Sequence, residues 1–407
     1  MRETFKPETA EQTVEAVAWA AAEEAPLEVI GRASKRSLGR PVQAGHGLDL
    51  SDLSGILFYE PEELVLSARA GTPLAEIEAV LAERGQQLAF EPPDLGPLLG
   101  GEAGAGSLGG IIAGNVSGPR RIKAGGARDH FLGVTAVSGR GEQFKSGGRV
   151  VKNVTGYDLC KLLAGSYGTL TVMTEITVKV LPAPEKTRSV LVFGLDDGQA
   201  LAAMTRALTS VHEVSGAAHL PAAAAATSGV SYLRDAGAAV TAVRVEGPAG
   251  SVAHRCDALR RELAHYGETE ELHGHNSGLL WREVGGARPF VGRRELAVWR
   301  ISVAPQDGPA VIAGLADGGD SLHYYDWGGG LVWLAVPDGE AAGHDRVRAA
   351  IGARGGHATL VRASEAVRAA VPVFQPQAPA LAALTARVKD GFDPQRILNP
   401  GRMYPGI

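Results

Sequence analysis

Glycine is the residue whose placement in this sequence points most directly to chemistry. The chain has 407 residues and 54 of them are Gly, about 13% against a usual value of about 7%. Nine of these glycines fall close together, at positions 96, 100, 101, 104, 106, 109, 110, 114 and 118. Backbone N–H groups that no side chain covers form concave binding sites for anions. Since a helix or strand loses about 0.5–1 kcal/mol for each Gly in place of Ala, this segment is expected to be irregular backbone that receives a pyrophosphate.

The glycine segment contains a formal GxGxxG pattern at residues 104–109, but its surroundings argue against a nicotinamide dinucleotide site. Such a site needs a strand before the pattern and an amphipathic helix after it. Instead, prolines precede the pattern and more glycines follow it: Pro92, Pro93, Pro97, Gly110, Gly114 and Gly118. The chain also contains no Gly-Lys-Ser or Gly-Lys-Thr sequence, which excludes a P-loop.

A second loop, at residues 31–39, has small and basic residues directly after a short apolar strand expected over 27–30. Its Lys35 and Arg36 could add positive charge to an anion site. Taken alone, this loop has the composition of an ordinary turn. Together with residues 96–118 it favours a cofactor site, because long structureless loops inside a compact domain are usually functional.

An ordered set of short motifs resembles a known flavoprotein family. Residues 90–94 (FEPPD), 107–121 and 126–133 resemble the FAD-binding domain of the vanillyl-alcohol-oxidase (PCMH-type) flavoproteins. Residues 151–159 (VKNVTGYDL), 164–170 (AGSYGTL), 174–176 (TEI) and 179–182 (KVLP) are similar to the E-subunit family of bacterial glycolate oxidases, and 397–403 (ILNPGRM) resembles the tail of FAD-linked oxidases. The resemblance is close over 27–182 and 390–403, and looser between them, where 299–302 and 326–329 carry it.

This resemblance implies an FAD site and assigns residues to it. The loops at 31–37 and 107–118 would hold the FAD pyrophosphate, while Asn153 and the Gly168-Thr169 turn would line the adenosine or flavin side. The tail would return to place Asn399 near the isoalloxazine. The FAD-binding residues implied in this way are Gly31, Arg32, Ala33, Ser34, Lys35, Pro93, Ser107, Leu108, Gly109, Gly110, Ala113, Gly114, Asn115, Ser117, Gly118, Asn153, Gly168, Thr169, Ile176 and Asn399.

The reaction implied by the resemblance is the oxidation of a 2-hydroxy acid, in which FAD takes the α-hydrogen as hydride. That reaction needs a cation for the substrate carboxylate, preferably a bidentate Arg, and a base such as His for the hydroxyl proton. The candidate clamps are Arg120, Arg282 and Arg300, and the candidate bases are His130, His323 and His357. The sequence does not choose among them, so the catalytic residues stay unknown at this point.

Two departures from related enzymes bear on the cofactor and on metals. The first Gly-rich loop has no His, the usual covalent flavin anchor in related oxidases, so FAD is expected to bind non-covalently. Related hydroxy-acid dehydrogenases carry paired His motifs for a metal, and no equivalent is found here. The closest spacing, His273-Gly274-His275, is interpreted as a loop, because metal sites need three or four ligands; no metal is therefore expected.

Composition limits the partners and the compartment. The formal net charge of -5 gives no electrostatic basis for binding nucleic acid, and the two cysteines, Cys160 and Cys256, cannot ligate an iron–sulfur cluster, which usually needs four. Electrons must therefore leave through another chain, and the resemblance implies a sister FAD subunit and an iron–sulfur subunit. The N-terminus lacks a signal-peptide pattern and no stretch reaches the roughly 20 apolar residues of a membrane helix. We expect a cytoplasmic protein, which its complex could hold at the inner face of the membrane.

The order of expected elements gives the fold class, α+β. The resemblance implies a PCMH-type FAD-binding domain at 1–183, and Pro182-Ala183-Pro184 predicts a boundary there. Residues 184–370 predict a ferredoxin-like α+β substrate or cap domain, because their strands and helices follow the order βαββαβ. The same order restarts at Leu296, which suggests two such units that face one another. Residues 371–407 form a C-terminal tail, which the resemblance returns to the FAD domain.

Three functions remain open from the sequence. The first is an FAD-binding subunit of a glycolate oxidase complex that converts glycolate to glyoxylate. The second is a non-catalytic scaffold or electron-relay flavoprotein subunit. The third is a stand-alone FAD-dependent dehydrogenase for another D-2-hydroxy acid such as D-lactate. The anaerobic response of the bound flavin to each acid would separate them.

Overall fold

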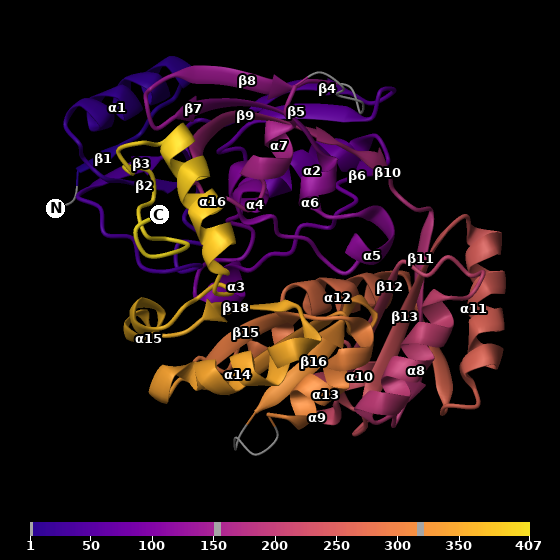
Figure 1. Ribbon diagram of the computed structural model, residues 1–407. Coiled ribbons are helices and arrows are strands. Elements are labelled where there is room, and N and C mark those ends of the chain that lie inside the picture. The colour runs from indigo at the N-terminus through magenta and orange to yellow at the C-terminus, as the bar shows by residue number, and fades with distance from the viewer. Residues whose placement is uncertain (1–2, 150–155, 316–320) are drawn as a thin grey trace. The chain divides into compact units, whose positions relative to one another are not determined.

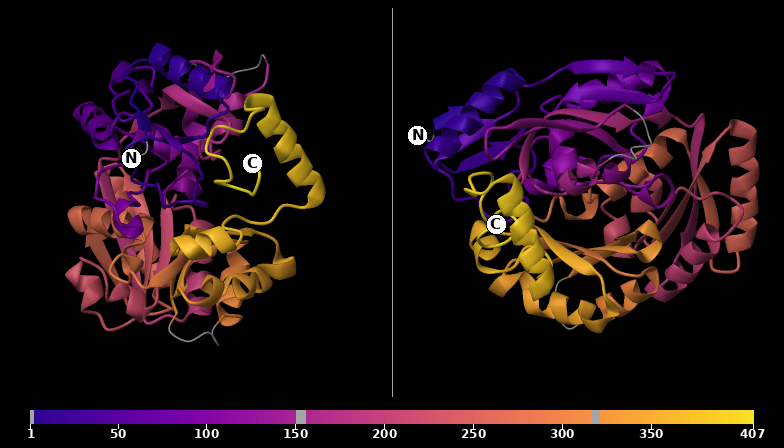
Figure 2. Two further views of the ribbon diagram at one scale, coloured as in Figure 1. Left: turned by 90° about the vertical axis from the view of Figure 1, so that its left-hand side faces the viewer. Right: turned by 45° about the horizontal axis from the view of Figure 1, so that its top comes forward.

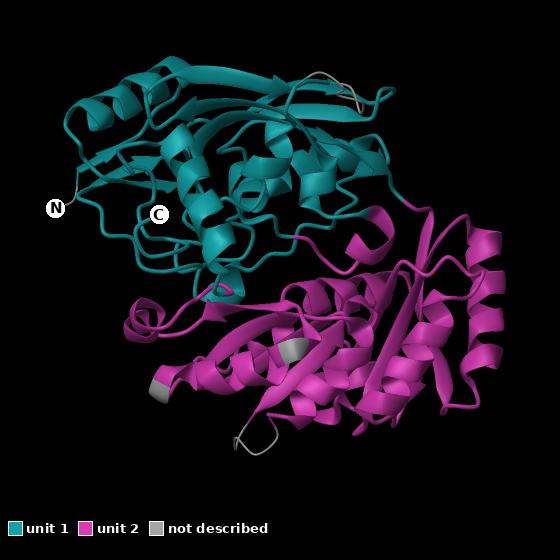
Figure 3. Ribbon diagram, in the orientation of Figure 1, with its two compact units in different colours: residues 1–116, 125–183, 376–407 teal, residues 117–124, 184–375 magenta. Residues whose placement is uncertain are grey.

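The chain divides into two compact units, which are described separately (Figure 3). The structure is a computed structural model that describes residues 3–149, 156–315 and 321–407. Unit 1 comprises residues 1–116, 125–183 and 376–407, and unit 2 comprises 117–124 and 184–375. The short segment 117–124, which the sequence interpretation kept with the first domain, thus groups with unit 2. No helix among the described residues is long and apolar enough to cross a membrane.

Unit 1 contains a three-stranded parallel sheet and a five-stranded antiparallel sheet (Figure 1). The first sheet has the order β1-β3-β2 and the second has the order β4-β5-β9-β7-β8. The bounds of these strands are β1 (Glu3–Phe5), β2 (Leu27–Ile30), β3 (His46–Asp49), β4 (Ile56–Glu60), β5 (Val65–Arg69), β7 (Phe131–Ser138), β8 (Gln143–Gly147) and β9 (Thr171–Lys179). A two-stranded pair, β6 (Gln86–Gln87) and β10 (Leu181–Pro182), completes the unit's strands.

The helices of unit 1 begin and end where the sequence provides caps and buried faces. Thr9 caps α1 (Ala10–Ala22) by accepting a hydrogen bond from the Gln12 N–H at 3.2 Å. The other helices of the unit are α2 (Leu74–Glu83), α3 (Gly96–Leu99), α4 (Leu108–Gly114), α6 (Ala127–His130), α7 (Leu159–Leu163) and α16 (Pro379–Phe392).

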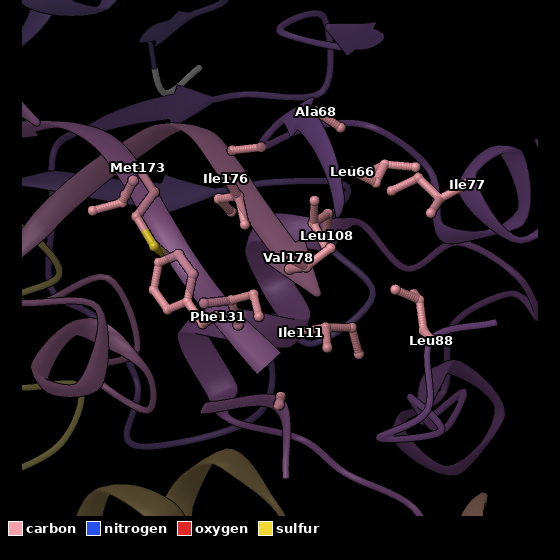
Figure 4. Close-up of a cluster of buried hydrophobic side chains, with 14 of the residues drawn as sticks. Leu66, Ala68, Ile77, Leu88, Leu108, Ile111, Phe131, Met173, Ile176 and Val178 are labelled. Atoms are coloured by element: carbon pink, nitrogen blue, oxygen red, sulfur yellow. The ribbon is translucent and has the colours of Figure 1, made fainter. Parts of the chain in front are cut away.

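The glycine segment is not wholly irregular, so that expectation was wrong. Two helices, α3 and α4, form within it. Helix α4 forms despite its glycines because Ser107 caps it and because Leu108, Ile111 and Ile112 are almost fully buried. Figure 4 shows Leu108 and Ile111 among the side chains of the hydrophobic cluster beneath the five-stranded sheet. Apolar burial therefore outweighs the low helix propensity of this segment.

Unit 2 is one continuous eight-stranded sheet made of two ferredoxin-like repeats. The strand order is β14-β11-β13-β12-β16-β17-β15-β18, so the repeats share an edge rather than face one another as two sheets. The strands are β11 (Lys186–Phe193), β12 (Gly216–Leu220), β13 (Val240–Gly247), β14 (Thr269–His273), β15 (Leu296–Ser302), β16 (Leu322–Asp326), β17 (Leu331–Pro337) and β18 (His357–Arg362).

Four helices of unit 2 follow the βαββαβ order that the sequence predicts, and the unit also contains helices outside that order. The repeat helices are α8 (Asp197–Leu208), α11 (Ala249–Leu263), α13 (Gly308–Ala313) and α14 (His344–Ile351), and the shorter ones are α5 (Arg121–Ala124), α9 (Ala222–Ala225), α10 (Ser231–Arg234) and α15 (Glu365–Ala370). The interpretation of 273–275 as a loop was wrong, because helix α12 (Gly274–Gly285) starts there and buries Leu280, Trp281 and Val284.

A cluster of polar side chains reinforces the edge where the two repeats meet. Strands β12 and β16 share one bridge pair, His219 with Tyr325. Asp197 of the first repeat accepts hydrogen bonds from the Tyr325 hydroxyl at 2.6 Å and from His323 Nε2 at 3.1 Å, and lies 3.5 Å from His219 Nε2. Burial would raise the pKa of Asp197, but these three partners lower it well below its usual value, so the carboxylate stays ionised.

The C-terminal tail belongs to unit 1 and is fixed there by a buried ion pair. Lys389 and Asp393 are both fully buried and lie 2.7 Å apart. The Lys389 ammonium also donates to the carbonyls of Thr169 (2.6 Å) and Leu398 (3.0 Å). Leu398 in turn forms a parallel bridge with Leu27. Both views of Figure 2 show the last residues running from α16 back along this unit.

We expect Asp393→Asn to destabilise unit 1 by about 3–5 kcal/mol, since removing one partner leaves a buried, uncompensated charge. Chemical denaturation of the variant measures this loss. The matched control is Asp390→Asn, which breaks the half-exposed pair between Asp390 of α16 and Arg396 beyond the end of that helix and should change stability by less than about 1 kcal/mol. Equal, small losses in the two variants would contradict a structural role for the buried pair.

Candidate functional site

A pocket in unit 1 brings the two predicted loops together. It holds about 750 Å³ of space, including its open mouth, and its wall comes from six separate parts of the sequence. The lining residues are Val29, Ile30, Gly31, Arg32, Ala33, Ser34, Lys35, Arg36, Leu38, Leu50, Ala70, Ser107, Gly109, Gly110, Ala113, Gly114, Tyr167, Gly168, Thr171, Met173 and Arg402. The loop after β2 and helix α4 therefore face one space, as the cofactor interpretation requires.

Glycines make room in this pocket for two different reasons. A Cβ on Gly109 would lie 2.8 Å from the carbonyl oxygen of Ala70, so this glycine allows α4 to pack closely on the backbone after β5. A Cβ on Gly110 would instead meet only side-chain atoms, those of Lys35 and Ser107, at 3.3 Å and beyond. Gly109 therefore serves packing on backbone, whereas Gly110 lets the Lys35 side chain lie close against α4.

Lys35 supplies positive charge to the glycine wall. Its Nζ lies 3.2 Å from Ser34 Oγ, and it reaches alongside Gly106 and Gly110. Burial lowers the pKa of Lys35 to about 8; the Asp94 carboxylate opposes this shift and the Arg402 guanidinium adds to it. A bound anion would favour the charged form of this ammonium.

The neighbouring basic residue has a structural role. Arg36 forms a bidentate pair with Glu28, at 2.8 and 2.6 Å, and hydrogen bonding to Glu28 raises the pKa of Arg36. This pair closes the loop back onto β2 and leaves Lys35 as the residue that faces α4.

The C-terminal tail forms hydrogen bonds to the backbone of the pocket wall. The Asn399 amide accepts from the Val29 N–H at 2.9 Å and donates to the Tyr167 carbonyl at 2.9 Å. Arg402 Nη2 donates to the carbonyl of Lys35 at 3.1 Å. Asn399 is 1% exposed, so its side chain joins backbone segments of the pocket wall. Arg402 also lines the pocket, and the sequence analysis did not name it.

Other residues assigned to the FAD site lie away from this pocket. Leu108 and Ile176 belong to the hydrophobic cluster under the sheet. Thr169 bonds the Ser166 carbonyl, and Asn115 ends α4 and accepts from the Arg128 N–H. Ser117 and Gly118 group with unit 2. Pro93 does not line the pocket, and Asn153 lies outside the described residues.

The pocket fits a dinucleotide cofactor by its chemistry. Its small residues expose backbone and its Lys35 and Arg402 provide cations, which suits a pyrophosphate. Its apolar wall of Val29, Leu50 and Met173 suits a flat ring system. Among the described residues, no group of three or more His, Cys, Asp or Glu is placed to hold a metal ion.

The candidate clamps differ in their surroundings. Arg120 forms a bidentate pair with Glu246 at 2.8 and 3.0 Å. Burial would raise the pKa of Glu246, but Arg244 and Arg120 outweigh it and hold that pKa at about 2. Arg282 is exposed on α12. Arg300 of β15 lies over the ring of Trp327, with its Cζ 4.9 Å from the ring centroid.

The three candidate bases lie in different surroundings. His130 is buried in unit 1, with its Nδ1 3.3 Å from the Lys179 carbonyl. His323 belongs to the Asp197 cluster. His357, at the start of β18, is exposed; its pKa is lowered by desolvation and then by the guanidiniums of Arg300, Arg121 and Arg348.

Comparison with known proteins agrees with this site. A family model described as an FAD binding domain matches residues 2–147. Glycolate oxidase subunit GlcE of Escherichia coli is 36% identical over 392 residues, covering 96% of each chain. Glycolate oxidase subunit GlcD of Bacillus subtilis is 32% identical over 151 residues, which is 37% of this chain and 30% of GlcD.

A similarity to a solved structure confirms the fold class. The 4-ethylphenol oxidase of Gulosibacter chungangensis aligns with a TM-score of 0.73 and 15% identity, covering 99% of this chain and 89% of that one. The sequence interpretation of a PCMH-type FAD-binding fold with a second α+β unit is therefore correct.

We expect Gly110→Val to remove FAD binding while the fold is kept, because its side chain would displace the flexible Lys35 side chain, which lies 3.3 Å from the Cβ position. FAD retention after purification and a thermal unfolding curve measure the two effects. Gly45→Val is the control, since a Cβ there meets nothing within 4 Å. FAD retained in full by Gly110→Val would show that the phosphates lie elsewhere.

We expect FAD affinity to fall as pH rises above about 8, by at most about tenfold per pH unit, because a diphosphate needs the charged form of Lys35. Fluorescence titration with FAD between neutral and alkaline pH measures this. Lys35→Arg should bind with little pH dependence, since guanidinium stays protonated. Lys35→Met should bind more weakly and also lose the dependence; a slope that persists in Lys35→Met would assign it to another group.

Proposed function

Because the chain belongs to the family of FAD-linked oxidases that includes glycolate oxidase subunit GlcE, we propose that it is an FAD-binding glycolate oxidase subunit that oxidises glycolate to glyoxylate. The observation that carries this proposal is 36% identity across nearly the full length of both chains, together with a glycine-lined, cationic pocket in unit 1. When bound, FAD supplies the acceptor for the hydride from the substrate's α-carbon.

The chain's own residues would bind and orient the two reactants. Lys35 and Arg402, which both line the pocket, would hold the pyrophosphate through their cationic side chains. The apolar wall at Val29 and Met173 would exclude water from the ring system. The substrate carboxylate would need a cationic partner, since a 2-hydroxy acid is anionic at neutral pH.

The electrons would leave through a partner chain. Cys160 and Cys256 are both fully buried, and burial raises the pKa of each thiol, to about 11 and about 12. Such thiols are poor metal ligands because the thiolate is the ligating form, and four are usual for a cluster. We therefore include in the proposal a sister FAD subunit and an iron–sulfur subunit as the acceptors.

We expect glycolate, added anaerobically to the purified FAD-loaded chain, to bleach the visible flavin absorbance. The Gly110→Val variant, supplied with the same FAD, gives the background for free flavin. Bleaching by D-lactate but not glycolate would replace the proposal with a dehydrogenase for another 2-hydroxy acid. A chain that holds FAD and is bleached by no 2-hydroxy acid would instead be a relay or scaffold subunit.

A further inference from the structure

A threonine in the wall of the cofactor pocket has a buried hydroxyl that no protein group satisfies. Thr171 lines the pocket and is 2% exposed. Its Oγ1 is buried and has no hydrogen-bond partner among the residues that the structure describes. Most buried polar side-chain atoms in proteins do have a partner, because an unpaired one loses its hydration without compensation. The Thr171 hydroxyl therefore needs a partner from outside the chain.

Neighbouring hydroxyl groups are paired within the protein. Ser107, which lines the same pocket, accepts a hydrogen bond from the Gly110 N–H at 3.3 Å. Further along the strand that carries Thr171, the Thr174 hydroxyl donates to the Thr135 carbonyl at 3.1 Å. The unpaired hydroxyl is thus a property of position 171 and not of this part of unit 1 in general.

The backbone that carries Thr171 is held firmly. Thr171 begins β9 and is paired there with Ser138 of β7. Two residues earlier, the Thr169 carbonyl accepts a hydrogen bond from the buried Lys389 ammonium at 2.6 Å. Rotation of the threonine side chain between its staggered rotamers brings the hydroxyl to the place of the methyl group. The hydroxyl can therefore turn to a ligand in the pocket while the backbone stays in place.

The surroundings of Thr171 suit a flat ring that has polar atoms on its edge. Met173 lies two residues further along β9 and also lines the pocket, so the two side chains share one face of the strand. Val29 and Leu50 add apolar surface to the same pocket. In a mostly apolar pocket, a few polar groups fix the orientation of the ligand. Both ring systems of FAD carry nitrogen atoms at their edges that can form such a bond.

We propose that the Thr171 hydroxyl forms a hydrogen bond to a ring nitrogen or oxygen of bound FAD and thereby fixes the orientation of that ring. This inference rests on the FAD site of the proposed function and is independent of the substrate. The hydroxyl is unpaired without FAD and paired with it, so it lowers the stability of the FAD-free chain and raises FAD affinity. A threonine with a purely structural role would not produce these two opposite effects.

The test compares two quantities in Thr171 variants: the unfolding temperature of the FAD-free chain and its affinity for FAD, followed by flavin fluorescence. Thr171→Val keeps the shape of the side chain and removes the hydroxyl. We expect it to bind FAD about fivefold more weakly, which converts to about 1 kcal/mol, while its FAD-free form unfolds at the wild-type temperature or above. Thr171→Ser keeps the hydroxyl and should bind FAD nearly as the wild type does.

Thr174→Val is the matched control, because Thr174 lies on the same strand, has a partner and does not line the pocket. It should unfold at a lower temperature than the wild type and keep the wild-type affinity for FAD. Wild-type FAD affinity in Thr171→Val, or a lower unfolding temperature of its FAD-free form, would overturn the proposal.

Two further measurements identify the ring. A shift of the visible flavin bands in Thr171→Val assigns the contact to the isoalloxazine, whereas unchanged bands with weaker binding of ADP assign it to the adenine. Weaker FAD binding with neither change would contradict a contact to a ring. If glycolate fails to bleach the flavin while Thr171→Val still loses FAD affinity, the glycolate oxidase function fails and the role of Thr171 stands.

Discussion

A single buried ammonium, that of Lys389, holds the end of the chain against the rest of unit 1. It donates to Asp393, Thr169 and Leu398, which lie on three different stretches of backbone. Asp393 also accepts a hydrogen bond from the Leu398 N–H at 2.8 Å. Buried charges persist only when hydrogen bonds replace their lost hydration. The tail is therefore bound by directional contacts that fix its position, beyond what apolar packing alone would specify.

This constraint matters because the cofactor pocket is lined by backbone. A wall of Gly and Ala cannot hold its shape through its own side chains, so it must be supported from outside. Asn399 joins the backbone at Val29 to that at Tyr167, and Arg402 fastens Lys35. On the other side, Leu108 and Ile112 anchor α4 in the core. The wall is thus made rigid by Asn399, Leu108 and Ile112, which do not line the pocket, and by Arg402, which does.

Local patterns in the sequence predicted most elements, and long-range contacts account for what they missed. Hydrophobic periodicity predicted the βαββαβ order of unit 2, because each of its strands and helices buries one face. The glycine spacing gave the location of the pocket, but the helix α4 was missed because Ser107 and buried Ile111 override propensity. Contacts between residues distant in sequence determine three features that local patterns do not predict. These are the role of Arg402, the grouping of 117–124 with unit 2 and the shared edge of the two repeats.

The two faces of the unit 2 sheet carry different polar side chains. Tyr325 points to the face where Asp197, His219 and His323 join the two repeats. Its neighbour Tyr324 points to the opposite face and shares the register partner Trp333 with Arg300. Asp197 has three partners and is ionised, which commits His323 to the seam between the repeats. Arg300 lies on the opposite face with Tyr324 and Trp333, so the two faces of one sheet carry separate sets of polar groups.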